Sequence, residues 1–171
     1  MLPEPLHPAV VHFPIVLAVL LPLTVVGALI AIRKGSPLRR TWLVPVGLAL
    51  ALTASAWASV ETGEAQEDQV ERVVPESAIH THEERAERFL VLSGALFAVL
   101  AGGMLGGTIG SASRMVGSVG AFLFLLPTVQ VGASGGELVY EHGAAAAYVT
   151  VDPASDHPDG DQDTHDGGQE R

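Results

Sequence analysis

The chain has 171 residues, of which 48% are hydrophobic and only 16% are charged, and its mean hydropathy is +0.36. An ordinary soluble domain is nearer a quarter charged, so this composition favours a membrane protein. The lack of cysteine excludes c-type haem attachment, iron–sulfur clusters, thiolate zinc sites and disulfides. A formal net charge of −10 argues against nucleic-acid binding, because phosphate contacts need clustered lysine and arginine.

Four uncharged apolar stretches are long enough to cross a bilayer, which needs about 20 residues. In chain order they cover residues 10–32, 41–60, 89–110 and 115–134. The segment before the first stretch has no basic n-region, so we expect that stretch to remain as a helix rather than be cleaved as a signal peptide. These features predict an all-α fold, a four-helix transmembrane bundle over residues 1–151. A disordered acidic tail is predicted over residues 152–171.

The charges between the stretches predict an orientation. The charged residues of the first and third connections are all basic: Arg33, Lys34, Arg39, Arg40 and Arg114. All nineteen acidic residues fall on the other side of the bundle. Because basic connections stay in the cytoplasm, we predict that both termini and the second connection lie outside.

The second connection, residues 61–88, is too long and too charged for a tight turn. Its first part is predicted to extend the second helix outward until Pro75 ends it. Thr81 and Glu84 have the spacing of a capping box, which predicts that a new helix starts at Thr81. Trp42, Trp57 and Tyr140 are predicted to anchor the helices at the membrane interface.

Histidines from separate chain segments fall on the predicted outer side. His12 is the most polar residue of the first stretch and is expected to face the bundle interior. His82 shares a helical face with apolar and small residues, namely Ile79, Ala86, Phe89 and Ser93. His80 instead lines up with Glu84, so His82 is predicted to point inward and His80 outward.

The heights of these histidines suggest which of them meet. At 1.5 Å per residue, His82 and His142 stand roughly 10 Å and 12 Å beyond the ends of their apolar stretches. They are therefore the best-matched pair of ligands. His12 lies just inside the first stretch and ranks next, and His7 ranks fourth.

Imidazoles that converge from separate helices indicate a cofactor or metal site. Two of them would bind the iron of haem b from opposite faces, with Arg72, Arg85 or Arg88 pairing with the propionates. The alternative is a zinc, copper or iron ion bound by His82, His142 and His12 with Glu64 and Glu83 as carboxylate ligands. Single histidines at an interface are also commonly solvated or structural, and that alternative stays open.

Two segments and one helix entry together resemble a known family. They are residues 7–15 (HPAVVHFPI), residues 135–143 (GGELVYEHG), and the His82-Glu83-Glu84 entry to the third helix. They are similar to a bacterial four-helix membrane family catalogued as domain of unknown function 2231, over about residues 5–150. The resemblance implies an inner-membrane protein, sometimes associated with Rieske or cytochrome-type redox modules. Its motifs cover His7, His12, His82, Gly135, Gly136 and His142.

The sequence thus predicts a membrane protein that binds haem or metal at its outer face and supports electron transfer, with no catalytic residues of its own. The lipid bilayer and a redox complex are the predicted partners. The alternative is a non-catalytic scaffold or assembly subunit of a membrane redox complex, in which the histidines are structural. A small-solute permease ranks last, because ionisable residues are missing near the predicted midplane.

Overall fold

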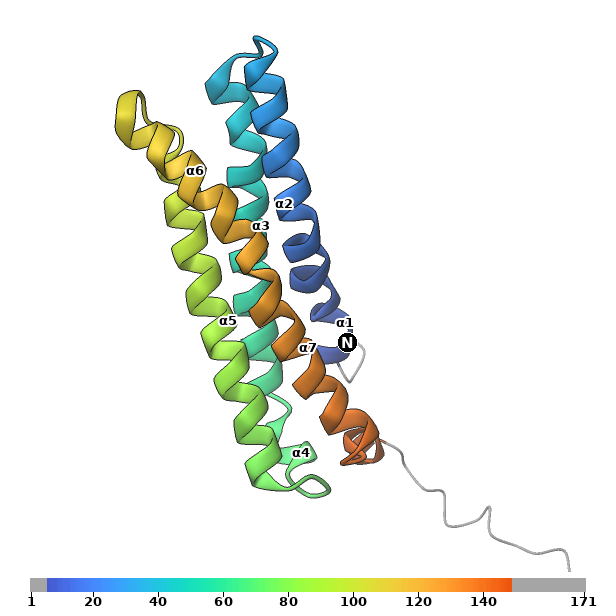
Figure 1. Cartoon of the computed structure of the whole chain (residues 1–171). Helices are drawn as coiled ribbons and strands as arrows, with labels where there is room; N and C mark the ends of the chain where they lie inside the picture. Colours follow the sequence, from blue (N-terminus) through green and yellow to red (C-terminus); the bar gives the residue numbers. More distant parts are fainter. Residues whose placement is uncertain (1–5, 149–171) are drawn as a thin grey trace, which may run out of the picture.

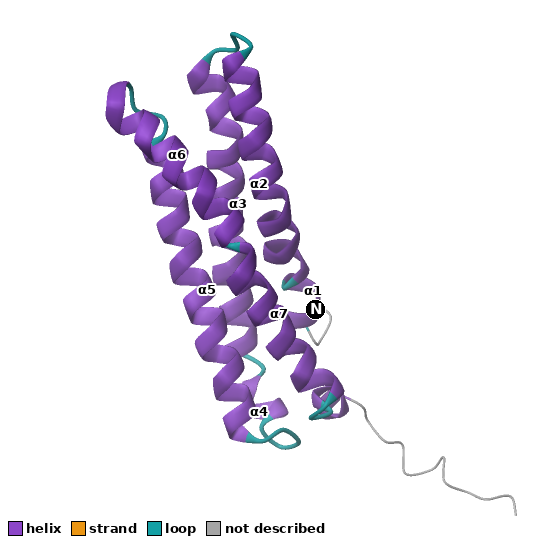
Figure 2. Cartoon of the chain, in the orientation of Figure 1, coloured by secondary structure: helices purple, strands orange, loops and turns teal. Residues whose placement is uncertain are grey.

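The computed structural model describes residues 6–148, and this part of the chain is helical, without strands (Figure 2). The predicted acidic tail, residues 152–171, lies outside the described residues. The helices in chain order are α1 (His7–Val10), α2 (His12–Arg33), α3 (Leu38–Glu64), α4 (Glu67–Val70), α5 (Glu76–Gly102), α6 (Gly107–Leu123) and α7 (Leu125–Tyr140), followed by the 3₁₀ helix η1 (Ala144–Tyr148).

The long helices α2, α3 and α5 run side by side with the bent pair α6–α7 (Figure 1). The most extensive contacts join α2 to α3 and α3 to α5, and α5 also packs against α6 and α7. Between these helices lies the larger of two apolar clusters, whose most completely buried large side chains include Leu21, Leu52 and Leu100. Burial of such side chains and close packing of small ones hold the helices together.

Within residues 6–148, three segments are long and apolar enough to cross a membrane: His7–Arg33, Leu38–Glu64 and Gly107–Tyr140. Their outward faces expose large apolar side chains such as Leu23, Val44 and Val129. Contiguous apolar surface of this kind marks an interaction site on a water-soluble protein, and on long apolar helices it suits lipid.

The third predicted stretch, residues 89–110, is not one helix. α5 ends at Gly102, a turn follows, and α6 begins at Gly107, where φ is +67°. Gly adopts this left-handed conformation without strain, and Gly107 completes the turn in which the chain reverses direction between α5 and α6. The uncharged part of α5 is therefore shorter than predicted, and the fourth predicted stretch, residues 115–134, falls within α6 and α7.

The predicted helix start at Thr81 is wrong. α5 begins at Glu76, directly after Pro75, whose extended backbone precedes the first turn. The Thr81 hydroxyl lies inside the helix and donates to the Ser77 carbonyl at 2.8 Å. Pro is well suited to the start of a helix, because its missing N–H would have no partner there.

Trp42 is a core residue and not the predicted interface anchor. Its side chain is fully buried, and its Nε1–H donates to the Leu100 carbonyl at 2.8 Å. The Arg114 guanidinium donates to the Gly103 carbonyl beside it. The Leu100 carbonyl also accepts from the Gly103 N–H, so Trp42 is its second donor, whereas Arg114 serves the carbonyl of Gly103, the residue that follows α5. Trp57, in contrast, is exposed.

Candidate functional site

His7 and His82 meet between α1 and α5. Their ring centroids are 6.3 Å apart and their planes are nearly perpendicular, at 84°. His7 is the first residue of α1, which packs against α3, and His82 lies in the second turn of α5. Two chain segments 75 residues apart thus place both rings at one end of the molecule.

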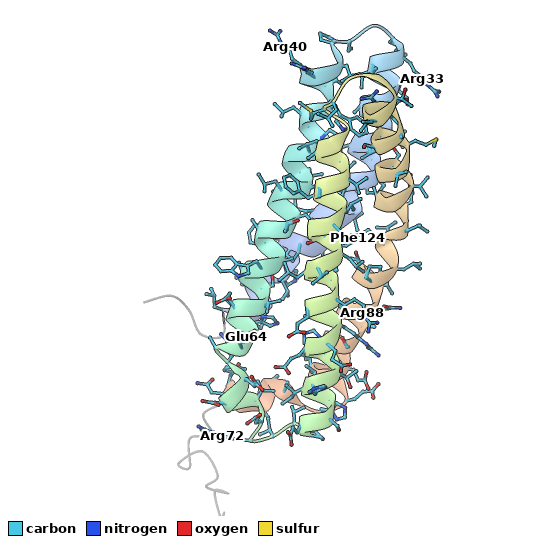
Figure 3. The ribbon with its side chains drawn as sticks, turned by 90° about the vertical axis from the view of Figure 1, so that its left-hand side faces the viewer. Arg33, Arg40, Glu64, Arg72, Arg88 and Phe124 are labelled. Carbon is cyan, nitrogen blue, oxygen red and sulfur yellow. The ribbon has the colours of Figure 1, made fainter. Side chains whose placement is uncertain are left out.

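This end carries the acidic residues of the described part of the chain, residues 6–148. Figure 3 shows Glu64 and Arg72 near it and Arg33 and Arg40 at the opposite end. α4 and the first turns of α5 lie together at the same end (Figure 1). We call it the acidic end, made of the end of α3, residues 61–64, with α4, the start of α5 and the end of α7.

The hydrogen bonds of His7 define its tautomer. Its Nδ1 lies 2.9 Å from the Ser59 carbonyl oxygen and 3.3 Å from Thr62 Oγ1. A carbonyl oxygen only accepts, so Nδ1 of the neutral ring carries the proton and donates. Nε2 then keeps an unprotonated lone pair, the form in which imidazole binds a metal.

His82 has the same tautomer for a different reason. Its Nδ1 lies 2.9 Å from the Ser134 hydroxyl oxygen. That hydroxyl already donates its only proton to the Val131 carbonyl, at 3.1 Å. With its proton on that carbonyl, Ser134 accepts from His82 Nδ1–H, and this arrangement leaves the lone pair on Nε2 of His82.

Each ring lies against a glycine of a neighbouring helix. A Cβ atom added at Gly63 of α3 would come within 3.2 Å of His7 Cε1. One added at Gly135 of α7 would come within 3.2 Å of His82 Cε1. A side chain at either position would crowd the ring, so the two glycines are what allow both imidazoles to enter the bundle.

The structure does not bring the other predicted histidines to this pair. His12 is exposed on α2. His142 is partly exposed in the turn after α7, and the ring contacts of residues 6–148 join His82 to His7 and not to His142. The predicted pairing of His82 with His142 depended on α7 continuing outward. The helix instead ends at Tyr140, ahead of Gly143 at a φ of +69°.

The predicted carboxylate ligands lie at the acidic end. Glu64 is exposed and Glu83 is partly buried. Burial, followed by the neighbouring carboxylates of Glu67, Glu87 and Glu64, raises the pKa of Glu83, while His80 acts in the opposite direction. Within residues 6–148, no group of three or more histidine, aspartate and glutamate side chains is arranged to hold a metal ion.

His82 is partly buried and His80 is exposed, as their positions on the two faces of α5 predict. His80 is exposed and lies 3.7 Å from Glu84. Burial, with smaller contributions from the positive charges of His7 and Arg85, lowers the pKa of His82 to about 4. His82 is therefore neutral at neutral pH.

This pKa predicts a pH-dependent stability of the metal-free protein. The unfolded chain takes up a proton at His82 near pH 6.5 and the folded chain only near pH 4, so acid favours unfolding between these values. We expect the free energy of unfolding to fall by about 2 kcal/mol between pH 6.5 and pH 4 and then to level off, with solvent screening of the partly exposed ring included. Thermal or denaturant unfolding in detergent, measured across this range, checks it.

Two variants assign the effect to His82. His82→Asn cannot titrate but keeps a donor for Ser134, and should lose the part of the pH dependence that is due to His82, while the part due to His7, whose pKa burial also lowers, remains. His80→Gln, two residues away on the exposed face, should keep it. An unchanged slope in His82→Asn would contradict the burial of His82.

The long apolar helices define the chain as a membrane protein, with a pair of partly buried histidines at one end of its helices. The chain belongs to the family described as predicted membrane protein (DUF2231), which matches residues 3–147. No curated protein and no solved structure matches the chain.

Proposed function

We propose that the chain crosses a bacterial inner membrane four times, with α5 as the third span and both termini outside. The support is the separation of charge along the helices. Basic residues of the α2–α3 connection lie at one end, with Arg33 and Arg40 labelled in Figure 3, and the acidic end lies opposite. Positive charge is retained in the cytoplasm, which assigns the acidic end and the His7–His82 pair to the outer side.

We further propose that His7 and His82 are ligands of a metal centre that supports electron transfer, either a bound ion or the iron of haem b. The observation that carries this is the pair of imidazoles 6.3 Å apart, each with Nδ1 held by a protein oxygen. A metal-binding histidine typically donates its second ring N–H in this way, which fixes both its tautomer and its orientation. His142 and His12 then have no role as ligands.

A structural role for the histidines is the second candidate, and the same hydrogen bonds favour it. His7 links α1 to α3, and His82 links α5 to α7. In a scaffold or assembly subunit of a membrane redox complex, the only role of the two histidines would be to link these helices.

Metal and haem analysis of the purified full-length protein separates the two candidates. The metal-centre proposal expects about one metal atom per chain, with a Soret band if it is haem iron. His82→Asn retains a donor in the position of Nδ1 but has no Nε2, so it should fold normally and lose the metal. A protein free of metal and haem as isolated and after incubation with either, whose His82→Asn variant is as stable as the wild type, would contradict the metal centre and support the scaffold.

A further inference from the structure

We infer that His7 and His82 together bind a single monovalent copper ion, Cu(I), as its two nitrogen ligands. The inference deepens the proposed metal centre and rests on it. It selects one ion from among haem iron, zinc, iron and copper, on the basis of the ring separation, the tautomers and the charge around the pair.

The ring separation is close to that of a linear arrangement. A metal–nitrogen bond of about 2.0 Å, with roughly 1.1 Å more to the ring centroid, separates two imidazoles on one ion by at most about 6.2 Å, with both Nε2 atoms on the line between the centroids. The observed centroid distance is 6.3 Å at an interplanar angle of 84°, so an ion between the rings requires both Nε2 atoms to face it. A tetrahedral ion would draw the centroids to about 5 Å. The hydrogen bonds to Ser59 and Ser134 hold both rings, so closing that gap would strain them.

Both free nitrogens are the ones that a metal needs. Among the described residues, neither Nε2 has a hydrogen-bond partner, and no buried side-chain nitrogen or oxygen lacks one. The two Nε2 atoms are therefore not sealed from solvent, and an ion can reach them. Cu(I), a d¹⁰ ion, is satisfied by two neutral imidazoles in a line, whereas zinc and iron take four or more ligands.

The local charge also favours a monovalent ion. The positive charge of the Arg85 guanidinium acts on His82. Repulsion between a bound cation and Arg85 is greater for a divalent ion than for a monovalent one. Glu64, one of the predicted carboxylate ligands, is exposed.

The close packing of the rings argues for a bare ion over haem. A porphyrin would have to enter the space around the pair, where each imidazole rests on a glycine of the adjacent helix. The apolar groove of about 290 Å³ between α5 and α6–α7, lined by residues such as Leu96, Val116 and Phe124, contains no histidine. A single ion needs only the room between two nitrogens.

The test titrates the full-length protein in detergent with Cu(I), anaerobically and under reducing conditions, against a chromogenic Cu(I) chelator of known affinity. We expect one Cu(I) per chain, with an X-ray absorption spectrum of a linear two-nitrogen site. His7→Asn and His82→Asn, which keep the Nδ1-type donors, should bind at least 100-fold more weakly. His80→Asn and His12→Asn are the matched controls and should bind as the wild type does. Zn(II) and haem b are titrated in parallel.

The results distinguish failure of the copper inference from failure of the proposed metal centre. If Zn(II) or haem binds in a manner that depends on His7 and His82 while Cu(I) does not, the copper inference is overturned and the metal centre stands. If none of the three binds, both are overturned. Cu(I) binding that survives His82→Asn, or a spectrum with three or more ligands, overturns the linear His7–His82 site. Circular dichroism and melting curves of each variant show that lost binding is not lost folding.

Discussion

Gly103→Ala should destabilise the protein by about 3 kcal/mol, because it combines overpacking with the loss of a buried hydrogen bond. The new Cβ would stand 2.3 Å from Trp42 Nε1 and 2.9 Å from Arg114 Cγ, distances that non-bonded atoms do not reach. Trp42 is fully buried and cannot move aside without releasing the Leu100 carbonyl. The unfolding midpoint in detergent, measured against the wild type, tests this.

Gly106→Ala provides the matched control in the same turn. A Cβ at Gly106 would meet nothing within 4 Å, and its φ is −83°, which any residue adopts. We expect its stability to stay within about 0.5 kcal/mol of the wild type. Equal stability of the two variants would show that Trp42 does not occupy the space beside Gly103.

Gly135→Val should displace the His82 ring and weaken metal binding at least tenfold. Cβ alone would approach His82 Cε1 to 3.2 Å, and the two methyl groups of valine extend the overlap. The ring then loses its hydrogen bond to Ser134, so its tautomer is no longer fixed and its Nε2 moves. Nitrogen-15 chemical shifts of labelled histidine report the tautomer in the metal-free protein, independently of the identity of the ion.

Gly136→Val, one residue further on the same helix, separates crowding from a general effect of valine. A Cβ at Gly136 would meet nothing within 4 Å. This variant should keep the Nδ1–H tautomer of His82 and the wild-type affinity. If both variants behave alike, the contact between Gly135 and His82 has no functional consequence.

The all-helical fold and the inward face of α5 could be predicted from the sequence, because both follow from local periodicity. His82 shares its face with Ile79, Phe89 and Ser93, and all three are buried. Trp42 was predicted wrongly because tryptophan near the end of an apolar stretch is typical of an interface anchor. Its burial depends on the α5 carbonyl that it binds, and that contact joins residues 58 positions apart.

The partner of His82 could not be predicted from distances along the helices. Distances along the helices place His7 and His82 at different heights in the membrane. That estimate assumes that the helices are parallel and begin where the apolar stretches begin. α1 is instead a separate short helix from His7 to Val10 that packs on α3, and α5 begins at Glu76. The available signal was a pair of small residues, Gly63 and Gly135, each with room for a ring.

If α5 is the third span, as proposed, its short uncharged part has a consequence for biosynthesis. Its uncharged part, residues 89–102, has 14 residues and measures about 21 Å, against a hydrocarbon thickness of about 30 Å. At its end, the Leu100 carbonyl accepts from Trp42 of α3 as well as from the backbone, and the Gly103 carbonyl accepts from Arg114 of α6. A nascent chain that has emerged only as far as α5 has the first of these donors but not the second. We therefore expect α5 to insert stably into the bilayer only after α6 has been synthesised, with α5 packing against α3.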